Sequence, residues 1–315
     1  MQELDQFLSA QLAAFEPEIR DFAEYCLGAS GKRLRPALVF FSGWRDGGSV
    51  SPNLVRAAAV VEMVHLATLV HDDIMDGADV RRGRHTAFRA YGSSAAVLMG
   101  DAFFAHALHL AAQFPTVEIC AIISECTRRV CAGEIMQTLR RGRTDLTLAD
   151  YRRIIELKTA ELFRVSCQLG GQLAGYGGDY VHAVSSFGIH LGIAYQIYDD
   201  LADFFGDERR IGKTLGTDLV GGKLTLPLLA LLERLPAPER AALAAEIHGD
   251  SPPQPGRWVE QMRAHGIFAA VAEAIQADLS LASAALQPWS EQPATPRLAQ
   301  LVNLLREQVR NLAGC

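Results

Sequence analysis

Long apolar runs are missing from this chain. No stretch approaches the roughly 20 consecutive apolar residues that a bilayer-spanning helix requires, so we expect no transmembrane segment. The first residues, MQELDQFLSAQLAAF, are acidic and amphipathic, unlike the basic and then apolar pattern of a secretory signal peptide. These two absences argue against an integral membrane or secreted protein, and we expect a cytoplasmic location.

Cysteine is sparse, and charge is not concentrated in one sign. The chain has six cysteines without the Cys-x-x-Cys spacing of metal and redox motifs, and we expect reduced thiols. Cys120, Cys126 and Cys131 could be considered as metal ligands, but they fall in a helical pattern, where we expect them to pack as small apolar residues. The net charge is −6 and basic residues occur in short motifs, so no nucleic-acid surface is expected.

What the chain does contain is a helical pattern over nearly its whole length. Apolar residues recur every three or four positions, whereas no alternating strand segment with hairpin turns is found. The segments with this pattern are 52–76, 94–113, 116–141, 147–174 and 180–205. Breaks with glycine or proline separate them, and we interpret these as loops. We predict an all-α fold with a single domain over residues 1–315, long enough to enclose a deep pocket.

Two aspartate-rich pentads, residues 72–76 (DDIMD) and 199–203 (DDLAD), are the most informative feature. Each lies in a predicted helix, so its first and fifth residues share a face one turn apart. Clustered carboxylates in an apolar setting need a cation, and Mg²⁺ usually shares such ligands with substrate phosphates. One pentad alone would most often be a solvated acidic face. Two of them favour a site in which a diphosphate and its metals lie between facing pentads.

Short basic motifs accompany the pentads. Residues 31–36 (GKRLRP) carry three cations, residues 79–83 (DVRRG) follow the first pentad, and residues 212–227 hold two lysines after the second. Arginine binds phosphate oxygens in bidentate fashion and lysine binds them as a point charge. Taken singly, each motif is more simply an exposed basic loop. Their combination with the pentads indicates two diphosphate substrates.

Taken in order, the motifs GKRLRP, HLATLVHDDIMDGADVRRG, GEIMQT, KTAELF, AYQIYDDLADFFGD and GKTLGTDLVGGKLTLPLLAL resemble those of the trans-isoprenyl (polyprenyl) diphosphate synthases. The resemblance implies an isoprenoid-synthase fold, an antiparallel helical bundle around a deep central cavity, and a homodimer. It also implies head-to-tail condensation of isopentenyl diphosphate with an allylic diphosphate by Mg²⁺-assisted ionisation, condensation and elimination. Three Mg²⁺ ions are expected per active site with substrate bound, and a transient membrane contact is expected for product release.

The resemblance assigns roles residue by residue. The metal ligands would be Asp72, Asp73, Asp76, Asp199, Asp200 and Asp203. Isopentenyl diphosphate would contact Lys32, Arg35, His65 and Arg82. The allylic diphosphate would contact Arg81, Lys158, Thr159, Gln196, Lys213 and Lys223. The catalytic set would be Asp72, Asp76, Lys158, Thr159, Gln196, Asp199 and Lys213. The family commonly has glutamate where this chain has Gly221, which puts the closure of the last loop in question.

Product length requires a steric wall, because each buried methylene contributes roughly 0.8 kcal/mol and affinity alone does not stop growth. Ala67 and Thr68, about one turn before the first pentad, are small, whereas a bulky aromatic residue there shortens products in this family. The pentad also lacks the two-residue insertion of many short-chain bacterial members. We therefore predict a product longer than farnesyl diphosphate, with a wall formed deeper by Met63, Phe104 or Leu108.

Several alternatives remain at this stage. The product could instead be of geranylgeranyl or farnesyl length, or the chain could be a non-catalytic subunit of a heteromeric synthase, although such a subunit should have eroded carboxylates. Head-to-head condensing enzymes and terpene cyclases share metal carboxylates but have no need for the GKRLRP and RRG motifs. A metal phosphohydrolase built on His71 and Asp72 would need further histidine ligands, for which the sequence shows no pattern.

Overall fold

The computed structural model describes residues 1–28, 31–47, 50–81, 83–207 and 215–313. Two compact units can be distinguished. Unit 1 comprises Met1–Arg128, Leu162–Gly188 and Pro288–Leu298, and unit 2 comprises Arg129–Glu161, Ile189–Gln287 and Ala299–Cys315. Both units are discontinuous in sequence, so the division does not separate two consecutive stretches of chain. The single domain over residues 1–315 stays a prediction.

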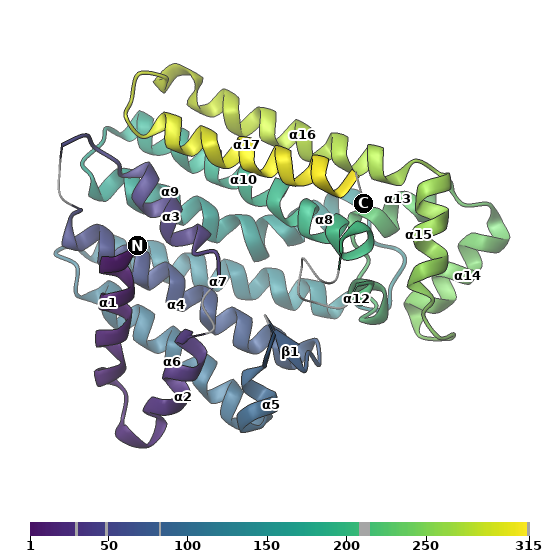
Figure 1. The fold of residues 1–315 in the computed structure, drawn as a ribbon, viewed down its shortest axis with the longest axis horizontal. Helices are drawn as coiled ribbons and strands as arrows, with labels where there is room; N and C mark the ends of the chain where they lie inside the picture. The colour runs from purple at the N-terminus through teal and green to yellow at the C-terminus, as the bar shows by residue number, and fades with distance from the viewer. Residues whose placement is uncertain (29–30, 48–49, 82, 208–214, 314–315) are drawn as a thin grey trace. The chain divides into compact units, whose positions relative to one another are not determined.

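In its described residues, the regular structure of unit 1 is helical apart from one short pair of strands (Figure 1). Its elements are α1 (Gln2–Gln11), η1 (Leu12–Ala14), α2 (Pro17–Gly28), α3 (Leu34–Ser42), α4 (Pro52–Met75), β1 (Val80–Arg81), β2 (Arg84–His85), α5 (Ala87–Tyr91), α6 (Ser93–Ala112), η3 (Gln287–Trp289) and parts of α7 (Val117–Leu139), α9 (Glu161–Leu173), α10 (Gly178–Phe205) and α17 (Thr295–Ala313). Ser51 accepts a hydrogen bond from the backbone N–H of Asn53 and Pro52 follows it, which begins α4.

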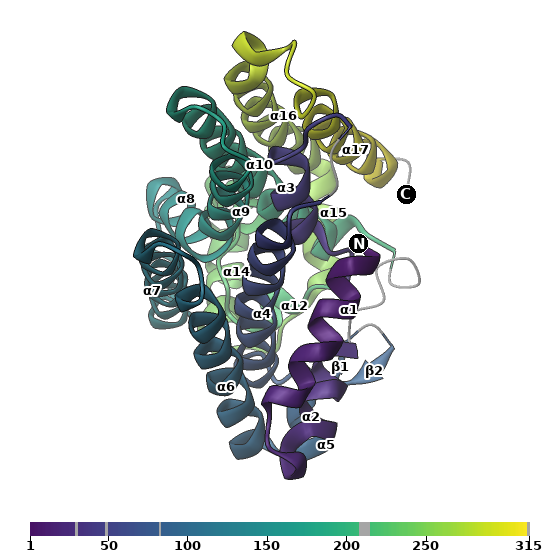
Figure 2. The same cartoon turned by 90° about the vertical axis from the view of Figure 1, so that its left-hand side faces the viewer.

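Helix α4 is the core of unit 1. Every residue from 57 to 64 is buried, as expected for a helix that is apolar all round. Helix α6 lies beside α4 in both views (Figures 1 and 2), and the two helices pack together extensively. The interior position of α4 fixes the first pentad, because that pentad forms the last turn of this helix.

Unit 2 contains the remainder of α7, α10 and α17 together with a set of shorter helices. These are α8 (Leu148–Ile155), the π-helical turn η2 (Glu156–Ala160), α12 (Thr217–Val220), α13 (Leu226–Arg234), α14 (Ala237–His248), α15 (Pro255–Ala264) and α16 (Ile267–Leu286). Helix α16 lies beside the C-terminal part of α17 (Figures 1 and 2), where Arg306 donates a hydrogen bond to Gln276.

Buried polar side chains connect the helices of unit 2. Asp278 of α16 is 1% exposed and accepts hydrogen bonds from Arg152 of α8 at 2.9 Å, while His190 of α10 lies 3.2 Å away. Glu246 of α14 accepts from the indole N–H of the buried Trp258 on α15 at 2.7 Å. Each buried carboxylate is thereby paired with donors, as burial requires.

The predicted helical segments are confirmed in position, with two local differences. Val80–Arg81 and Arg84–His85, for which no strand is expected, form a two-stranded antiparallel ladder with Val80 opposite His85. The segment 147–174 is not one uniform helix, because residues 156–160 form a π-turn between α8 and α9. A π-turn inserts an extra residue into a helix and often marks a functional position; here it carries Lys158 and Thr159.

The absence of a transmembrane segment stays a prediction, although three helices are candidates by length and composition. The segments Pro52–Met75, Ser93–Ala112 and Ile267–Trp289 are long and apolar enough to cross a membrane. None of these helices is an unbroken apolar run, because polar residues interrupt each of them. Few of those polar residues are charged, so the average hydropathy of each helix stays high. In the first of them, 72% of the most apolar window is buried inside the protein, against 39% and 33% in the others. Packing against neighbouring helices therefore accounts for much of the apolar character of α4.

Candidate functional site

The first pentad occupies the C-terminal end of α4. Gly77, with φ of +60°, ends the helix: its N–H bonds the carbonyl of Ile74 and the N–H of Ala78 bonds that of Asp73, which is a Schellman motif. Asp72 is half-buried, Asp73 is buried and Asp76 is exposed. Carboxylates are unfavourable at the negative end of a helix dipole, where cations are favoured. The pentad therefore concentrates negative charge at a position that attracts cations.

Arg81 is the cation that the structure places on the first pentad. Its Nε donates to Oδ1 of Asp73 at 2.6 Å. Arg81 lies on β1. The strand paired with it, β2, is attached to α2 by Tyr25, whose hydroxyl donates to the carbonyl of His85 at 2.7 Å. The Arg84 guanidinium also stacks over the Tyr25 ring at 4.3 Å. Arg81 thus contacts a pentad carboxylate, which the sequence did not predict, and its contact with the allylic diphosphate stays a prediction.

The predicted isopentenyl diphosphate residues are partly brought together in unit 1. Arg35 donates to Nε2 of His65 at 3.0 Å, and its guanidinium lies 5.0 Å from the Phe163 ring centroid. Arg33, which begins α3 with φ of +49°, bonds the buried Glu62 at 2.7 Å. A left-handed arginine costs energy, and such strain is common near functional sites. Lys32 is exposed, and Arg82 lies outside the described residues.

The predicted wall residues lie on α4 and α6. Met63 and Ala67 are fully buried, whereas Thr68, Phe104 and Leu108 are half-buried. The Phe104 ring packs on His71, with 5.8 Å between ring centroids. Phe104 is therefore next to the residue that precedes the first pentad. The role of these residues as a wall, and the deep cavity itself, stay predictions.

The second pentad occupies the C-terminal part of α10, where Asp200 is fully engaged by the protein. Oδ1 of Asp200 accepts from Nε2 of Gln196 at 2.7 Å, and Oδ2 accepts from the Tyr151 hydroxyl at 2.6 Å. Gln196 in turn accepts from the Thr159 hydroxyl at 2.7 Å. We call these four residues the Tyr151–Thr159 relay. Burial and the neighbouring Asp200 carboxylate hold the pKa of Tyr151 well above its usual value, so the phenol stays a donor.

Asp203, predicted as a metal ligand, holds the start of α12. It is 1% exposed, and its oxygens accept from the Thr217 hydroxyl at 2.8 Å and from the Asp218 N–H at 3.0 Å. This carboxylate caps the first turn of α12. Asp199, four residues earlier, is half-buried. The second pentad therefore has one residue that organises α12 and one that organises the relay.

The last predicted loop is described only in part. Lys223 is half-buried and Lys213 lies outside the described residues. Gly221 has φ of −81°, a conformation open to any residue, and an added Cβ would lie 3.3 Å from the Thr217 carbonyl. The backbone thus does not require glycine at position 221, and whether it alters loop closure stays open to experiment.

Lys158 lies on the π-turn and contacts α7. Its Nζ is 2.5 Å from Oε2 of Glu134 and 2.8 Å from Oε1 of Gln137. Glu134, Gln137 and Tyr151 were given no role from the sequence. The spacing of Glu134 and Gln137, three residues apart within the GEIMQT motif, was the available signal. Nothing in the sequence indicated that Tyr151 reaches Asp200, because this contact depends on how α8 packs.

The carboxylates fit Mg²⁺ only in combination with a substrate. Among the residues with described positions, no group of three or more His, Cys, Asp or Glu side chains is arranged to hold a metal. Mg²⁺ usually takes one or two protein carboxylates and completes its shell with water and phosphate oxygens. In unit 1, Asp72 and Asp76 supply hard oxygen donors at the C-terminal end of α4, where cations are favoured. In unit 2, Asp199 supplies a further carboxylate on α10. Taken by itself, each unit offers carboxylate oxygens that fit a divalent cation shared with a phosphate group.

Comparison with known proteins gives consistent results. The family model described as polyprenyl synthetase matches residues 16–263. The octaprenyl diphosphate synthase of Haemophilus influenzae is 36% identical over 246 residues, which are 78% of this chain and 74% of that protein. The heptaprenyl diphosphate synthase component 2 of Geobacillus stearothermophilus is 38% identical over 252 residues, 76% of this chain and 77% of that protein.

A solved structure shows the same fold. The polyprenyl synthase of Caulobacter crescentus, complexed with calcium and isoprenyl diphosphate, has a TM-score of 0.86 to this chain at 31% identity. The match covers 97% of this chain and 93% of that one. The predicted all-α isoprenoid-synthase fold is confirmed.

Proposed function

Because the chain belongs to the polyprenyl synthetase family, we propose that it condenses isopentenyl diphosphate head-to-tail with an allylic diphosphate. The chain is a prenyltransferase, and the product proposed for it is a trans-polyprenyl diphosphate longer than farnesyl diphosphate. The observation that carries the proposal is the intact pair of aspartate pentads, each placed at the C-terminal part of a long helix. The names of the octaprenyl and heptaprenyl relatives support a long product.

The reaction begins with the loss of diphosphate from the allylic substrate, which leaves an allylic cation. Divalent cations, when bound, would be held by Asp72, Asp76 and Asp199 and would neutralise charge on the departing diphosphate. We propose Mg²⁺ in this role, three ions per site, in line with the calcium complex of the Caulobacter relative. Lys158, Lys213 and Lys223 add positive charge; one unit pair at ~4 Å contributes about 4 kcal/mol at an effective dielectric near 20.

The allylic cation must be stabilised without water. Thr159 and Gln196 present oxygen lone pairs, and the hydrogen bond between them fixes the orientation of both dipoles. Electrons of the isopentenyl double bond then form the new carbon–carbon bond, and loss of a proton regenerates a double bond. The departed diphosphate is the proposed base. Arg35 and His65, paired at 3.0 Å, are proposed to bind the isopentenyl diphosphate.

The proposal is tested by diphosphate release from the purified chain. Release should require isopentenyl diphosphate, an allylic diphosphate and Mg²⁺ together. Release from the allylic substrate alone at the same rate would indicate a cyclase or a hydrolase and would contradict the condensation.

A second candidate function is that of one component of a heteromeric synthase. The observation that favours it is the similarity to a relative named component 2. Under this alternative, the purified chain would release diphosphate only after another subunit is added.

A homodimer is also proposed. Helix α6 exposes apolar side chains, with Leu98 68% and Val97 42% exposed, and apolar surface of this kind is commonly covered in an assembly. Light scattering at low micromolar concentration tests this, and a species of only 34.2 kDa would contradict it. The cytoplasmic location and the membrane contact for product release stay predictions.

A further inference from the structure

The π-turn that carries Lys158 and Thr159 lies directly against the backbone of α7. A Cβ added at Gly133 would be 2.5 Å from the backbone nitrogen of Lys158 and 2.8 Å from Cβ of Leu157. No ordinary side chain fits at that separation, so only glycine allows α7 to approach the turn this closely. Small shifts between α7 and the turn would therefore displace Lys158 and Thr159.

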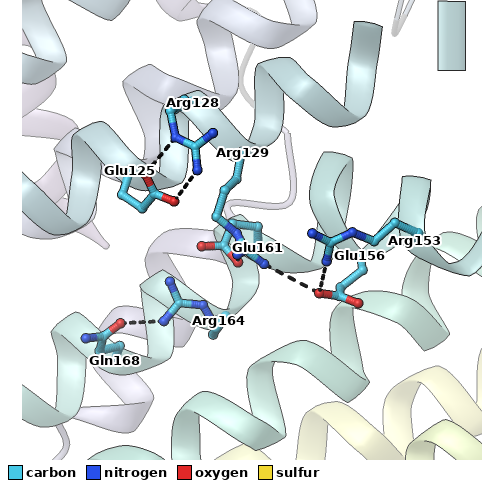
Figure 3. A network of polar contacts seen from close by, with 8 residues as sticks. All are labelled: Glu125, Arg128, Arg129, Arg153, Glu156, Glu161, Arg164 and Gln168. Atoms are coloured by element: carbon cyan, nitrogen blue, oxygen red, sulfur yellow. Dashed lines mark hydrogen bonds and ion pairs between the residues drawn. The ribbon is translucent and has the colours of Figure 1, made fainter. Parts of the chain in front are cut away.

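Arg129 connects α7 to both ends of this turn. Its Nη2 lies 3.4 Å from Oε1 of Glu156, the first residue of the π-turn, and its Nε lies 3.1 Å from Oε2 of Glu161, the first residue after it. Figure 3 shows the Arg129 side chain extending from α7 toward these two glutamates, with Arg153 reaching Glu156 from α8. One guanidinium thus bridges the two residues that flank Leu157, Lys158, Thr159 and Ala160.

The two ion pairs differ in their environment. Glu156 is 33% exposed, and a pair with it alone would contribute little. Glu161 is 1% exposed, and a buried carboxylate needs a close cation. The planar guanidinium can contact two carboxylates at once, which an ammonium group does less well. Arg129 is therefore suited to hold the turn at two points.

We propose that Arg129 is a positioning residue that keeps the π-turn in register, so that Lys158 and Thr159 face the allylic substrate. The effect of Arg129 on allylic substrate binding rests on the proposed function. Its effect on the conformation of the π-turn does not. Arg129 itself contacts no reacting atom in this account. It acts through the backbone of residues 156–161, and through Thr159 on the Gln196 amide.

Arg128 provides a matched control on the same helix. It is exposed and pairs with Glu125, three residues earlier, at 2.6 Å, as Figure 3 also shows. This pair lies within a single helix and connects no second element. Arg128→Met removes the same charge from α7 as Arg129→Met and leaves the π-turn contacts untouched.

The test compares Arg129→Met with the double variant Arg129→Met/Glu161→Gln. The single variant leaves the buried Glu161 charge without Arg129 and should melt at a lower temperature. The double variant removes both charges and should recover the melting temperature. If Arg129 positions the turn, the double variant still shows a KM for the allylic diphosphate raised about tenfold or more, because displaced Lys158 and Thr159 bind this substrate less well even in a folded enzyme.

The KM for isopentenyl diphosphate should stay near the wild-type value in the double variant. Recovery of the allylic KM along with the melting temperature would overturn the proposal, because Arg129 would then only neutralise Glu161. An equal rise in both KM values would overturn it as well. Arg128→Met should match the wild type in every measurement.

Hydrogen exchange provides a readout that does not depend on catalysis. The backbone amides of residues 156–160 should exchange faster in Arg129→Met/Glu161→Gln than in the wild type or in Arg128→Met. Unchanged exchange there would contradict the positioning role. A wild-type protein without condensation activity would refute the proposed function, whereas the exchange comparison would still decide the role of Arg129.

Discussion

Thr159 donates a hydrogen bond to Gln196, with 2.7 Å between Oγ1 and Oε1. The pair forms one end of the Tyr151–Thr159 relay. In this relay the Gln196 amide donates a hydrogen bond to one oxygen of Asp200, and the Tyr151 hydroxyl donates to the other. The second pentad thus serves two purposes. Asp200 orients the side chains proposed to stabilise the allylic cation, whereas Asp199 remains the more accessible carboxylate.

Tyr151→Phe tests the relay. The phenyl ring keeps the buried volume, but Asp200 loses a donor and Gln196 is less firmly oriented. Turnover should fall about 10- to 100-fold, since misoriented groups lose this much, while the KM for isopentenyl diphosphate stays unchanged. Tyr198→Phe, on the half-buried neighbour of Asp199, is the control and should behave as wild type. Equal kinetics in the two variants would show that the relay does not act in catalysis.

Asp72→Asn and Asp199→Asn test the proposed metal ligands. Each substitution keeps the shape of the side chain and removes one charge and one anionic oxygen. Turnover should fall by about 100-fold or more, and the Mg²⁺ concentration for half-maximal rate should rise. The melting temperature should change little. Asp179→Asn, an exposed residue at the opposite end of α10, serves as the control. Near-normal rates in both pentad variants would remove the metal assignment.

Arg35→Ala tests the isopentenyl diphosphate site. A hydrogen bond to a charged group is worth about 1.5–3 kcal/mol, so the KM for isopentenyl diphosphate should rise about 10- to 100-fold. The KM for the allylic substrate should not follow. Arg45→Ala, which removes an exposed cation in the loop after α3, should leave both constants unchanged. A rise confined to the allylic KM would mean that the two diphosphate sites are assigned in reverse.

Ala67→Phe and Phe104→Ala test the wall. Ala67 is fully buried, so an added ring would cost stability, typically about 1–3 kcal/mol, and would block any channel that passes it. Products should become shorter while the first condensation continues. Phe104→Ala should lengthen products if this ring forms part of the floor. An unchanged product spectrum in a folded Ala67→Phe variant would refute the direction of the channel, whereas an unchanged Phe104→Ala spectrum would move the floor to Met63 or Leu108.

His106 makes stability sensitive to mild acid. Burial, and secondarily the neighbouring His109, lower the pKa of His106 below its usual value. The unfolded chain therefore binds a proton more readily, so this residue costs no stability above a pH of about 6.5 and lowers the free energy of unfolding as the pH falls below it. His106→Gln should lose less stability than wild type between pH about 7 and about 5 in urea titrations. Equal losses in His106→Gln and in the exposed His85→Gln would contradict this.

The helices of this protein could be predicted from the sequence because apolar spacing and glycine or proline breaks are local signals. The segments around residues 52–76 and 180–205 correspond to α4 and α10 within a few residues. The proximity of Thr159 and Gln196 could also be predicted, because the family resemblance assigns both residues to the allylic substrate. The family and its fold followed from the combination of motifs.

Other features depend on packing and had no local signal. The π-turn at 156–160 forms where Gly133 lets α7 approach, and periodicity alone continues the helix through it. Likewise, Asp200 and Asp203 have the same pentad chemistry as Asp199, but Tyr151 and α12 engage them in the folded chain. Helices α6 and α16 are also candidate membrane spans by length and composition, although neither is an unbroken apolar run. Length and apolar content alone do not reveal what covers a helix.

Chain-length analysis of the wild-type product tests the central claim most directly. The purified chain, without any other subunit, is incubated with isopentenyl diphosphate, a short allylic diphosphate and Mg²⁺, and the dephosphorylated products are separated by chromatography. We expect a prenyl alcohol longer than farnesol that disappears when Mg²⁺ or either substrate is omitted. Absence of any product longer than the allylic starter, from a protein that is folded by circular dichroism, would contradict it.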